Sequence, residues 1–140
     1  MIRYILDTDI LTLLQHRHPA VLNRVAREKP DELAITILSV EEQLSGWYRQ
    51  LRRAKNPAEL AKVYDYLTNT LRSLTGLPIL SFSESAILRV KVLTAQRLNV
   101  RKTDLSIGAI ALEHGATVAT RNMRDYERIP GLKVEDWSTP

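Results

Sequence analysis

Tyr4-Ile5-Leu6-Asp7-Thr8-Asp9-Ile10-Leu11 is the stretch of sequence that decides the fold. Three apolar residues end abruptly at an acid, which indicates a short buried strand that leads directly into a helix. We predict that this helix covers residues 10–15. Such a strand is typical of a parallel sheet, in which crossover helices join one strand to the next and cover both faces.

The rest of the chain repeats this alternation of strand and helix. Ser39, Ser83 and Thr103 are expected to begin helices, Asn56-Pro57 marks the start of a long one, and Gly115 ends another. The predicted strands are 33–37, 77–80, 117–120 and 133–135, and the predicted helices are 19–27, one from residue 39, 57–76, 83–98 and 103–114. These elements predict an α/β fold with a parallel sheet flanked by helices on both faces.

Length and composition limit the classes of protein to consider. A chain of 140 residues with 44% hydrophobic residues fits one domain, 1–140, with a sizeable core. No apolar run is long enough to cross a membrane, and the acid at position 7 comes too early for a secretory signal. We therefore expect a cytoplasmic protein without a membrane partner.

The types of metal ligand in the chain are also limited. The absence of cysteine excludes thiolate zinc sites and disulfides, and only three scattered histidines are present, His16, His18 and His114. Any metal must therefore be bound by oxygen. The net charge of +4 is compatible with a nucleic-acid partner, although many ordinary proteins carry a similar excess of Lys and Arg.

Three acids are candidates for such a metal site. Asp7 ends the first strand and Glu42 follows the second by a short segment, so both are expected at the edge where the carboxyl ends of parallel strands meet. Asp104 lies in the first turn of a mostly apolar helix and has no strand before it. Carboxylates that gather in this way usually bind a divalent cation, because a cation offsets their mutual repulsion.

Each acid also has a purely structural interpretation. Asp7 can cap the helix that follows it. Ser39-Val40-Glu41-Glu42 matches a capping box, in which Glu42 bonds back to the start of its helix. Asp104 can simply interact with a helix dipole. The segment after the fourth strand adds Asn122 and Asp125, which are possible oxygen ligands or turn-stabilising residues.

Taken together, these segments resemble PIN-domain ribonucleases, specifically the VapC-type toxins of bacterial toxin–antitoxin pairs. The resemblance is carried by the motifs Ile5–Leu11, Glu42–Gly46, Asp104–Ala109 and Thr120–Leu132 in this order, followed by Glu135-Asp136-Trp137. It implies a single PIN-like domain with a five-stranded parallel sheet and a Mg²⁺- or Mn²⁺-dependent endoribonuclease that cleaves RNA. It further implies a growth-inhibiting toxin, neutralised by a cognate antitoxin and assembled as a homodimer.

The resemblance also assigns roles to residues. Asp7, Glu42 and Asp104 would be the metal ligands, with Asp9 in a supporting position. The family often has a fourth acid where Asn122 stands, so Asn122, Asp125 or water would complete the catalytic site.

Basic residues near these motifs are candidates for binding the RNA backbone. Those beside the acids are Arg101, Lys102, Arg121 and Arg124. Arg49, Arg52 and Arg53 lie on the helix of Glu42, and a solvated helix face is the simpler interpretation of Arg49 and Arg52.

Two other functions remain open at this point. A PIN-like domain without catalytic activity would serve as an RNA-binding or scaffold module. A phosphatase similar to the haloacid dehalogenases would use Asp7 as its nucleophile, although Ile10-Leu11 departs from the residues that follow the second acid in that family.

Overall fold

The sheet consists of five short parallel strands in the order β3-β2-β1-β4-β5. The computed structural model describes all 140 residues. The strands are β1 (Tyr4–Leu6), β2 (Leu33–Thr36), β3 (Ile79–Leu80), β4 (Thr117–Ala119) and β5 (Lys133–Glu135). The predicted five-stranded parallel sheet is therefore confirmed, with β1 at its centre.

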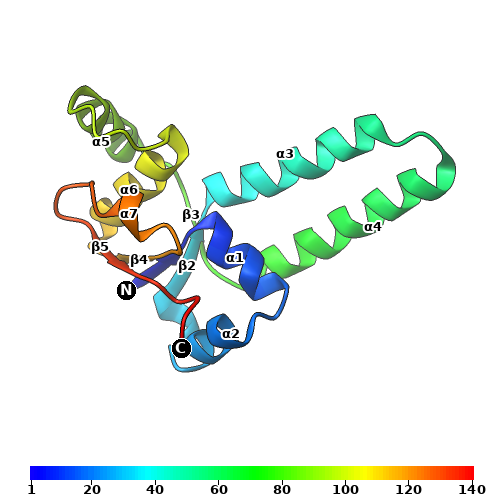
Figure 1. Cartoon of the computed structure of the whole chain (residues 1–140), viewed down its shortest axis with the longest axis horizontal. Helices are drawn as coiled ribbons and strands as arrows, with labels where there is room; N and C mark the ends of the chain where they lie inside the picture. Colours follow the sequence, from blue (N-terminus) through cyan, green and yellow to red (C-terminus); the bar gives the residue numbers. More distant parts are fainter.

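Helices cover both faces of this sheet, as predicted (Figure 1). Side chains of β1 alternate between two core clusters: Ile5 packs in one cluster, and Tyr4 and Leu6 pack in the other. The first cluster includes residues of α5, α6 and α7, and the second includes residues of α1, α2 and α4. The helices are α1 (Thr8–Gln15), α2 (Pro19–Ala26), α3 (Ile37–Arg53), α4 (Pro57–Leu74), α5 (Glu84–Ala95), α6 (Lys102–His114) and α7 (Met123–Tyr126), with a 3₁₀ turn at Pro30–Glu32. None of them combines the length and the apolar surface needed to cross a bilayer.

Helices α3 and α4 extend together away from the rest of the chain and form an arm (Figure 1). We call the remainder of the chain the body. Strand β2 runs into α3 without a loop, because Thr36 is both the last strand residue and the N-cap of the helix, accepting a hydrogen bond from the Ser39 N–H at 3.4 Å. The predicted helix start at Ser39 is therefore wrong, and so is the capping box that would have used Glu42.

The other predicted helix ends are partly confirmed. Asn56 and Ser83 cap α4 and α5 as expected, and Gly115 ends α6 with a left-handed φ of 61°. The cap assigned to Thr103 is wrong, because α6 already begins at Lys102 and has no side-chain cap. Helix α5 ends at Ala95 rather than Leu98, since the following turn contains left-handed Arg97 and Asn99.

Candidate functional site

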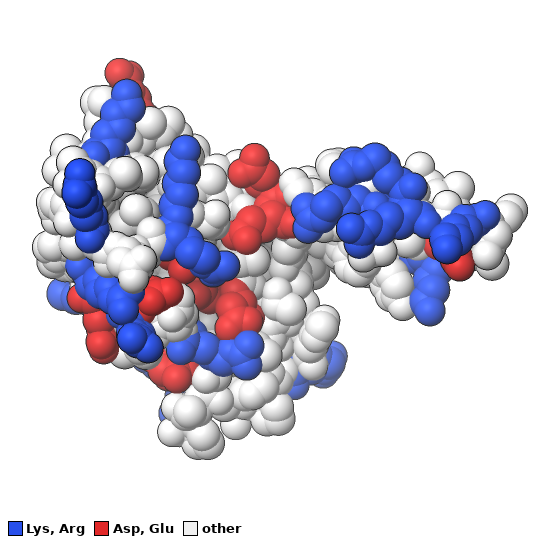
Figure 2. Space-filling model, turned by 45° about the horizontal axis from the view of Figure 1, so that its top comes forward, with Lys and Arg blue, Asp and Glu red and all other residues white.

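A polar pocket lies where the carboxyl ends of β1 and β4 meet the starts of three helices. Its volume is about 450 Å³, and no hydrophobic residue lines it. Figure 2 shows acidic side chains gathered in the hollow between body and arm, with Lys and Arg side chains around that hollow and along the arm. The lining residues are Asp7, Thr8, Asp9, Thr12, Glu42, Arg101, Asp104 and Asn122. All three acids predicted as metal ligands are thus part of one pocket.

Asp7 has both of the positions that the sequence left open. It caps α1 by accepting a hydrogen bond from the Ile10 N–H at Oδ1, at 2.9 Å, and it also lines the pocket. Only 5% of its surface is exposed. Burial raises the pKa of Asp7 from 3.8 to about 6; hydrogen bonds from Thr120 and from the Ile10 N–H oppose this shift, and the charges of Asp9 and Asp104 add to it.

Asp104 is brought to the pocket by residues of the segment after β4. The Tyr126 hydroxyl donates to Asp104 Oδ1 at 3.2 Å, and Asn122 Nδ2 donates to Oδ2 at 3.3 Å. Because β4 pairs with β1, the segment after β4 begins beside Asp7. These contacts explain how an acid with no strand before it comes to lie near Asp7.

Glu42 lies at the more exposed side of the pocket, on the first turns of α3. The Thr8 hydroxyl donates to Glu42 Oε1 at 2.8 Å, and the same hydroxyl lies 2.9 Å from Ser39 Oγ. Thr8 thus links the start of α1 to the start of the arm. This contact orients the Glu42 carboxylate toward the pocket that contains Asp7.

Asn122 and Asp125, the two candidates for the fourth position, have different surroundings. Asn122 lines the pocket, whereas Asp125 is not one of the lining residues. Asn122 Nδ2 donates to Asp125 Oδ2 at 2.8 Å, and Asp125 also pairs with Arg128 at 3.5 Å. Asp125 therefore contacts the pocket only through Asn122.

The basic residues near the pocket fall into two groups. Arg101 pairs with Asp104 at 3.4 Å, and Arg121 makes two hydrogen bonds to Asp9, at 2.6 and 2.9 Å. The hydrogen bonds to Asp9 raise the pKa of Arg121. Lys102 and Arg124 are exposed and take no part in an ion pair.

The types of donor in the pocket fit a hard divalent cation. Four carboxyl groups line it, against the single guanidinium of Arg101, and no nitrogen or sulfur ligand is present. In the present conformation no three acidic or histidine side chains are close enough to form a complete metal cage. The residues therefore fit an ion that keeps several water ligands, as Mg²⁺ does, better than one enclosed by protein.

The raised pKa of Asp7 leads to a prediction about stability in the absence of metal. The folded chain holds the Asp7 proton more tightly than the unfolded chain does, so the contribution of Asp7 to stability should fall as pH rises from about 4 to about 6 and stay low above that. With EDTA present at pH near 7.5, Asp7→Asn should raise the free energy of unfolding by about 2 kcal/mol, because asparagine keeps the cap and removes the buried charge. Urea denaturation measures the change.

The matched control is Asp65→Asn, which alters an exposed acid in the middle of α4. It should leave the urea midpoint unchanged both near pH 7.5 and near pH 4. Near pH 4 the Asp7→Asn variant and the wild type should unfold alike. Equal midpoints of Asp7→Asn and the wild type near pH 7.5 as well as near pH 4 would contradict the proposed cost of ionising Asp7.

Two residues of the site were missed in the sequence. Tyr126 is fully buried and bonds to Asp104, and Thr8 bonds to Glu42. A signal for Tyr126 was present, because it follows Asn122 by four residues and a short helix there places both on one side. Nothing in the sequence pairs Thr8 with Glu42, because that contact joins α1 to the arm.

The chain was compared with known proteins and solved structures. No family model matches the chain. The chain is 24% identical to the tRNA(fMet)-specific endonuclease VapC of Salmonella typhimurium, over 98% of this chain and 99% of that protein. It is 28% identical to ribonuclease VapC2 of Rickettsia felis, over 96% of this chain and 97% of the relative. A toxin–antitoxin complex from Klebsiella pneumoniae contains a chain of the same fold, with a TM-score of 0.71 and 25% identity over 96% of this chain and 97% of that one.

Proposed function

We propose, starting from the chain's membership of the VapC-type PIN-domain family, that it is an endoribonuclease toxin that requires Mg²⁺ or Mn²⁺. The observation that carries the proposal is the pocket that gathers Asp7, Glu42 and Asp104 from three different helix starts. Two of these carboxyl groups are buried, which is costly for a negative charge unless a cation binds beside it.

Asp7, Glu42 and Asp104 are the residues that would hold the ion. A bound Mg²⁺ or Mn²⁺ neutralises charge on phosphate oxygens and makes water more acidic, which promotes hydrolysis of a phosphodiester bond. Asn122 fixes Asp104 and completes the fourth side of the pocket, and Asp125 holds the Asn122 amide in place. We thus assign Asp125 a supporting role.

The basic residues around the pocket are assigned to RNA binding. Lys102 and Arg124 are exposed, so each can contact a phosphate without breaking an internal ion pair. Arg101 and Arg121 pair with Asp104 and Asp9 at the pocket, so their guanidinium groups lie where a substrate phosphate would approach the acids.

We assign two further partners to the chain. One is a cognate antitoxin that neutralises the toxin, supported by the similarity to the Klebsiella toxin–antitoxin complex. The other is a second copy of the chain. The single chain leaves Ile87, Leu88 and Val92 of α5 exposed at 41, 53 and 61%, which is apolar surface available to a partner. Sedimentation of the purified chain, alone and with its antitoxin, measures both assemblies.

The test of the nuclease function is cleavage of RNA by the purified chain. The named substrate of the Salmonella relative makes tRNA(fMet) the first RNA to assay. Cleavage should require Mg²⁺ or Mn²⁺, stop with EDTA and return when the metal is restored in excess. RNA that remains intact under all these conditions would favour the alternative of a non-catalytic PIN-like RNA-binding module.

Tyr126 gives a prediction about the support of Asp104. Tyr126→Phe keeps the buried ring and removes only the hydroxyl that donates to Asp104 Oδ1. The metal concentration needed for half-maximal cleavage should rise about 10-fold, since residues that orient a metal ligand typically have effects of this size. A metal titration of the cleavage rate measures it.

The control for this variant is the behaviour at saturating metal, where the rate should return to within about threefold of the wild type. A fall in rate that no metal concentration corrects would contradict a role in orienting Asp104. Urea denaturation of Tyr126→Phe separates loss of orientation from loss of folding.

A further inference from the structure

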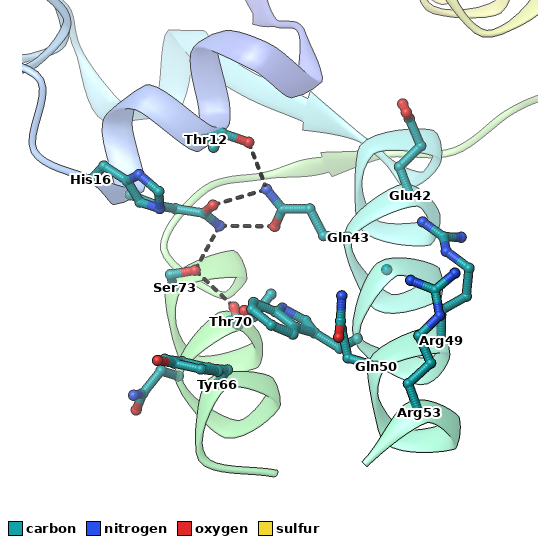
Figure 3. Close-up of a pocket in the computed structure, with 14 residues that line it drawn as sticks. Thr12, His16, Glu42, Gln43, Arg49, Gln50, Arg53, Tyr66, Thr70 and Ser73 are labelled. Atoms are coloured by element: carbon teal, nitrogen blue, oxygen red, sulfur yellow. Dashed lines mark hydrogen bonds between the residues drawn. The ribbon is translucent and has the colours of Figure 1, made fainter. Parts of the chain in front are cut away.

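A second pocket of about 580 Å³ lies between α1, α3 and α4, at the root of the arm (Figure 3). It adjoins the acidic pocket, because Thr12 and Glu42 line both of them. A strand of RNA with its scissile phosphate at Glu42 and Asp104 can therefore reach the second pocket with a neighbouring nucleotide. The proposed nuclease function gives it no role.

One side of α3 forms a track from the acids into the arm. Glu42, Gly46, Arg49 and Arg53 are spaced by four, three and four residues and so lie along one side of the helix. Figure 3 shows Glu42, Arg49 and Arg53 in this arrangement. None of the chain's ion pairs includes either arginine. Two unpaired guanidinium groups that follow an acidic site suit phosphates of a strand that leaves it.

Gly46 keeps this track open. It lies one turn after Glu42, and a Cβ added there would come within 3.8 Å of Arg49 Nη2. A larger side chain would occupy the space between the acid and the first arginine. The absence of one allows a backbone to approach α3 closely at this point.

The wall of the pocket contains an aromatic stack. Trp47 of α3 and Tyr66 of α4 lie with ring centroids 5.1 Å apart and planes inclined by 22°. The Trp47 Nε1–H donates to Thr70 at 2.8 Å, which fixes the indole, and Tyr66 is 42% exposed. The Lys62 ammonium lies 5.9 Å from the Tyr66 ring centroid, so a further flat ring that stacks on this exposed ring would displace a flexible lysine side chain.

The remaining lining distinguishes a nucleobase from an apolar peptide side chain. Of fourteen lining residues only two are hydrophobic, and these are the two aromatic residues of the stack. Most of the others carry amide or hydroxyl groups, among them the Gln15–Gln43 pair, whose amides bond to each other at 2.8 and 2.9 Å. An aliphatic anchor from a protein would find no aliphatic wall here, whereas a base offers a ring to stack and polar edges to pair.

We propose that this pocket binds one unstacked nucleobase of the RNA substrate, adjacent to the scissile phosphate, with Tyr66 stacked on the base and Arg49 and Arg53 on the neighbouring phosphates. The proposal rests on the nuclease function stated above and extends it to the selection of substrate. A base held here would favour single-stranded or looped RNA, in which a base is free to leave its neighbours.

The test combines a protein variant with abasic RNA. In an oligonucleotide that the wild type cleaves, removal of the base at one position near the cleavage site should raise KM about 10-fold, the size expected for loss of one base–aromatic stack. Tyr66→Ala should raise KM for the intact oligonucleotide by a similar factor, with kcat little changed. For the oligonucleotide that lacks the base at that position, Tyr66→Ala should then cause no further rise in KM.

Tyr64→Ala is the matched control, because Tyr64 is on the same helix, 52% exposed and outside the pocket. It should leave KM unchanged for every oligonucleotide. Independent, multiplying effects of the abasic site and Tyr66→Ala would overturn the inference. An unchanged KM in Tyr66→Ala, together with weaker binding of the cognate antitoxin, would also overturn it and assign the pocket to a protein.

A second readout does not depend on cleavage. An RNA trinucleotide should quench the fluorescence of Trp47, and the same molecule without its central base should not, while fully buried Trp137 gives a constant background. No quenching overturns the inference whether or not RNA is cleaved. Quenching without any cleavage supports the base pocket and counts against the nuclease function alone.

Discussion

Replacing Asp104 with asparagine should reduce RNA cleavage at least about 100-fold, because the transition-state stabilisation that depends on a metal ion is worth several kcal/mol. Asparagine has almost the same shape as aspartate, and its carbonyl oxygen can still accept the hydrogen bond from Tyr126. The variant therefore keeps a side chain of the same size and removes the negative charge, together with the hydrogen bond from Asn122 and the ion pair with Arg101. Initial rates on a fluorescent RNA at saturating Mg²⁺ measure the effect.

Asp65→Asn, on the exposed surface of the arm, is the control for loss of one carboxylate elsewhere and should cleave at the wild-type rate. Urea denaturation of Asp104→Asn excludes unfolding as the cause: the variant loses the hydrogen bond from Asn122 and the ion pair with Arg101, but should remain folded under the assay conditions. Cleavage that persists in Asp104→Asn would show that the activity does not come from this pocket. A contaminating nuclease would give the same result. Asp7→Asn, purified in the same way, would reveal the contaminant, because it would then cleave RNA as well.

Trp137→Ala should lower the free energy of unfolding by about 3–5 kcal/mol, the cost of deleting a large buried aromatic side chain. Trp137 is 2% exposed and packs on Tyr4 with ring centroids 5.0 Å apart. The Arg24 guanidinium lies 4.6 Å from the centroid of the Trp137 ring. The Trp137 Nε1–H donates to Glu135 at 3.1 Å. Its loss would open a cavity beside the central strand β1, which leads directly to Asp7.

Trp137→Phe should have a smaller effect, because it keeps an aromatic ring on Tyr4 and loses only part of the volume and one hydrogen bond. Tyr48→Ala, which removes an aromatic ring that is 48% exposed, should change stability by less than about 0.5 kcal/mol. Urea denaturation of the three variants measures the series. A midpoint unchanged by Trp137→Ala would contradict the inclusion of the C-terminal segment in the core.

The parts of the fold that depend on local sequence could be predicted. The run Tyr4-Ile5-Leu6 is apolar on both faces and therefore predicts a buried parallel strand, which the structure confirms. The position of Asp7 could be predicted from the same run, because Asp7 directly follows the strand and the carboxyl ends of parallel strands lie together on one side of the sheet. Asn56 and Ser83 were correctly assigned as caps, since each bonds to an N–H three residues away.

The parts that depend on contacts between distant segments could not be predicted in detail. Two hydroxyl residues, Thr36 and Ser39, were suitable to begin α3, and the strand before it determines which one does so. With Thr36 as the cap, Glu42 is free of the capping box and reaches Thr8. Asp104 likewise owes its position to contacts with Asn122 and Tyr126, from which it is separated by the rest of α6 and by β4.

The direct junction between β2 and α3 determines which changes in chain length the molecule can tolerate. One residue inserted after Thr36 would turn the whole of α3 by about 100° and carry Glu42 and both arginines away from the pockets. The linker 54–56 at the far end of the arm is under no such restriction, because it joins two helix ends at the tip. Relatives that keep this site should therefore differ in length at the tip of the arm and agree in length at its root.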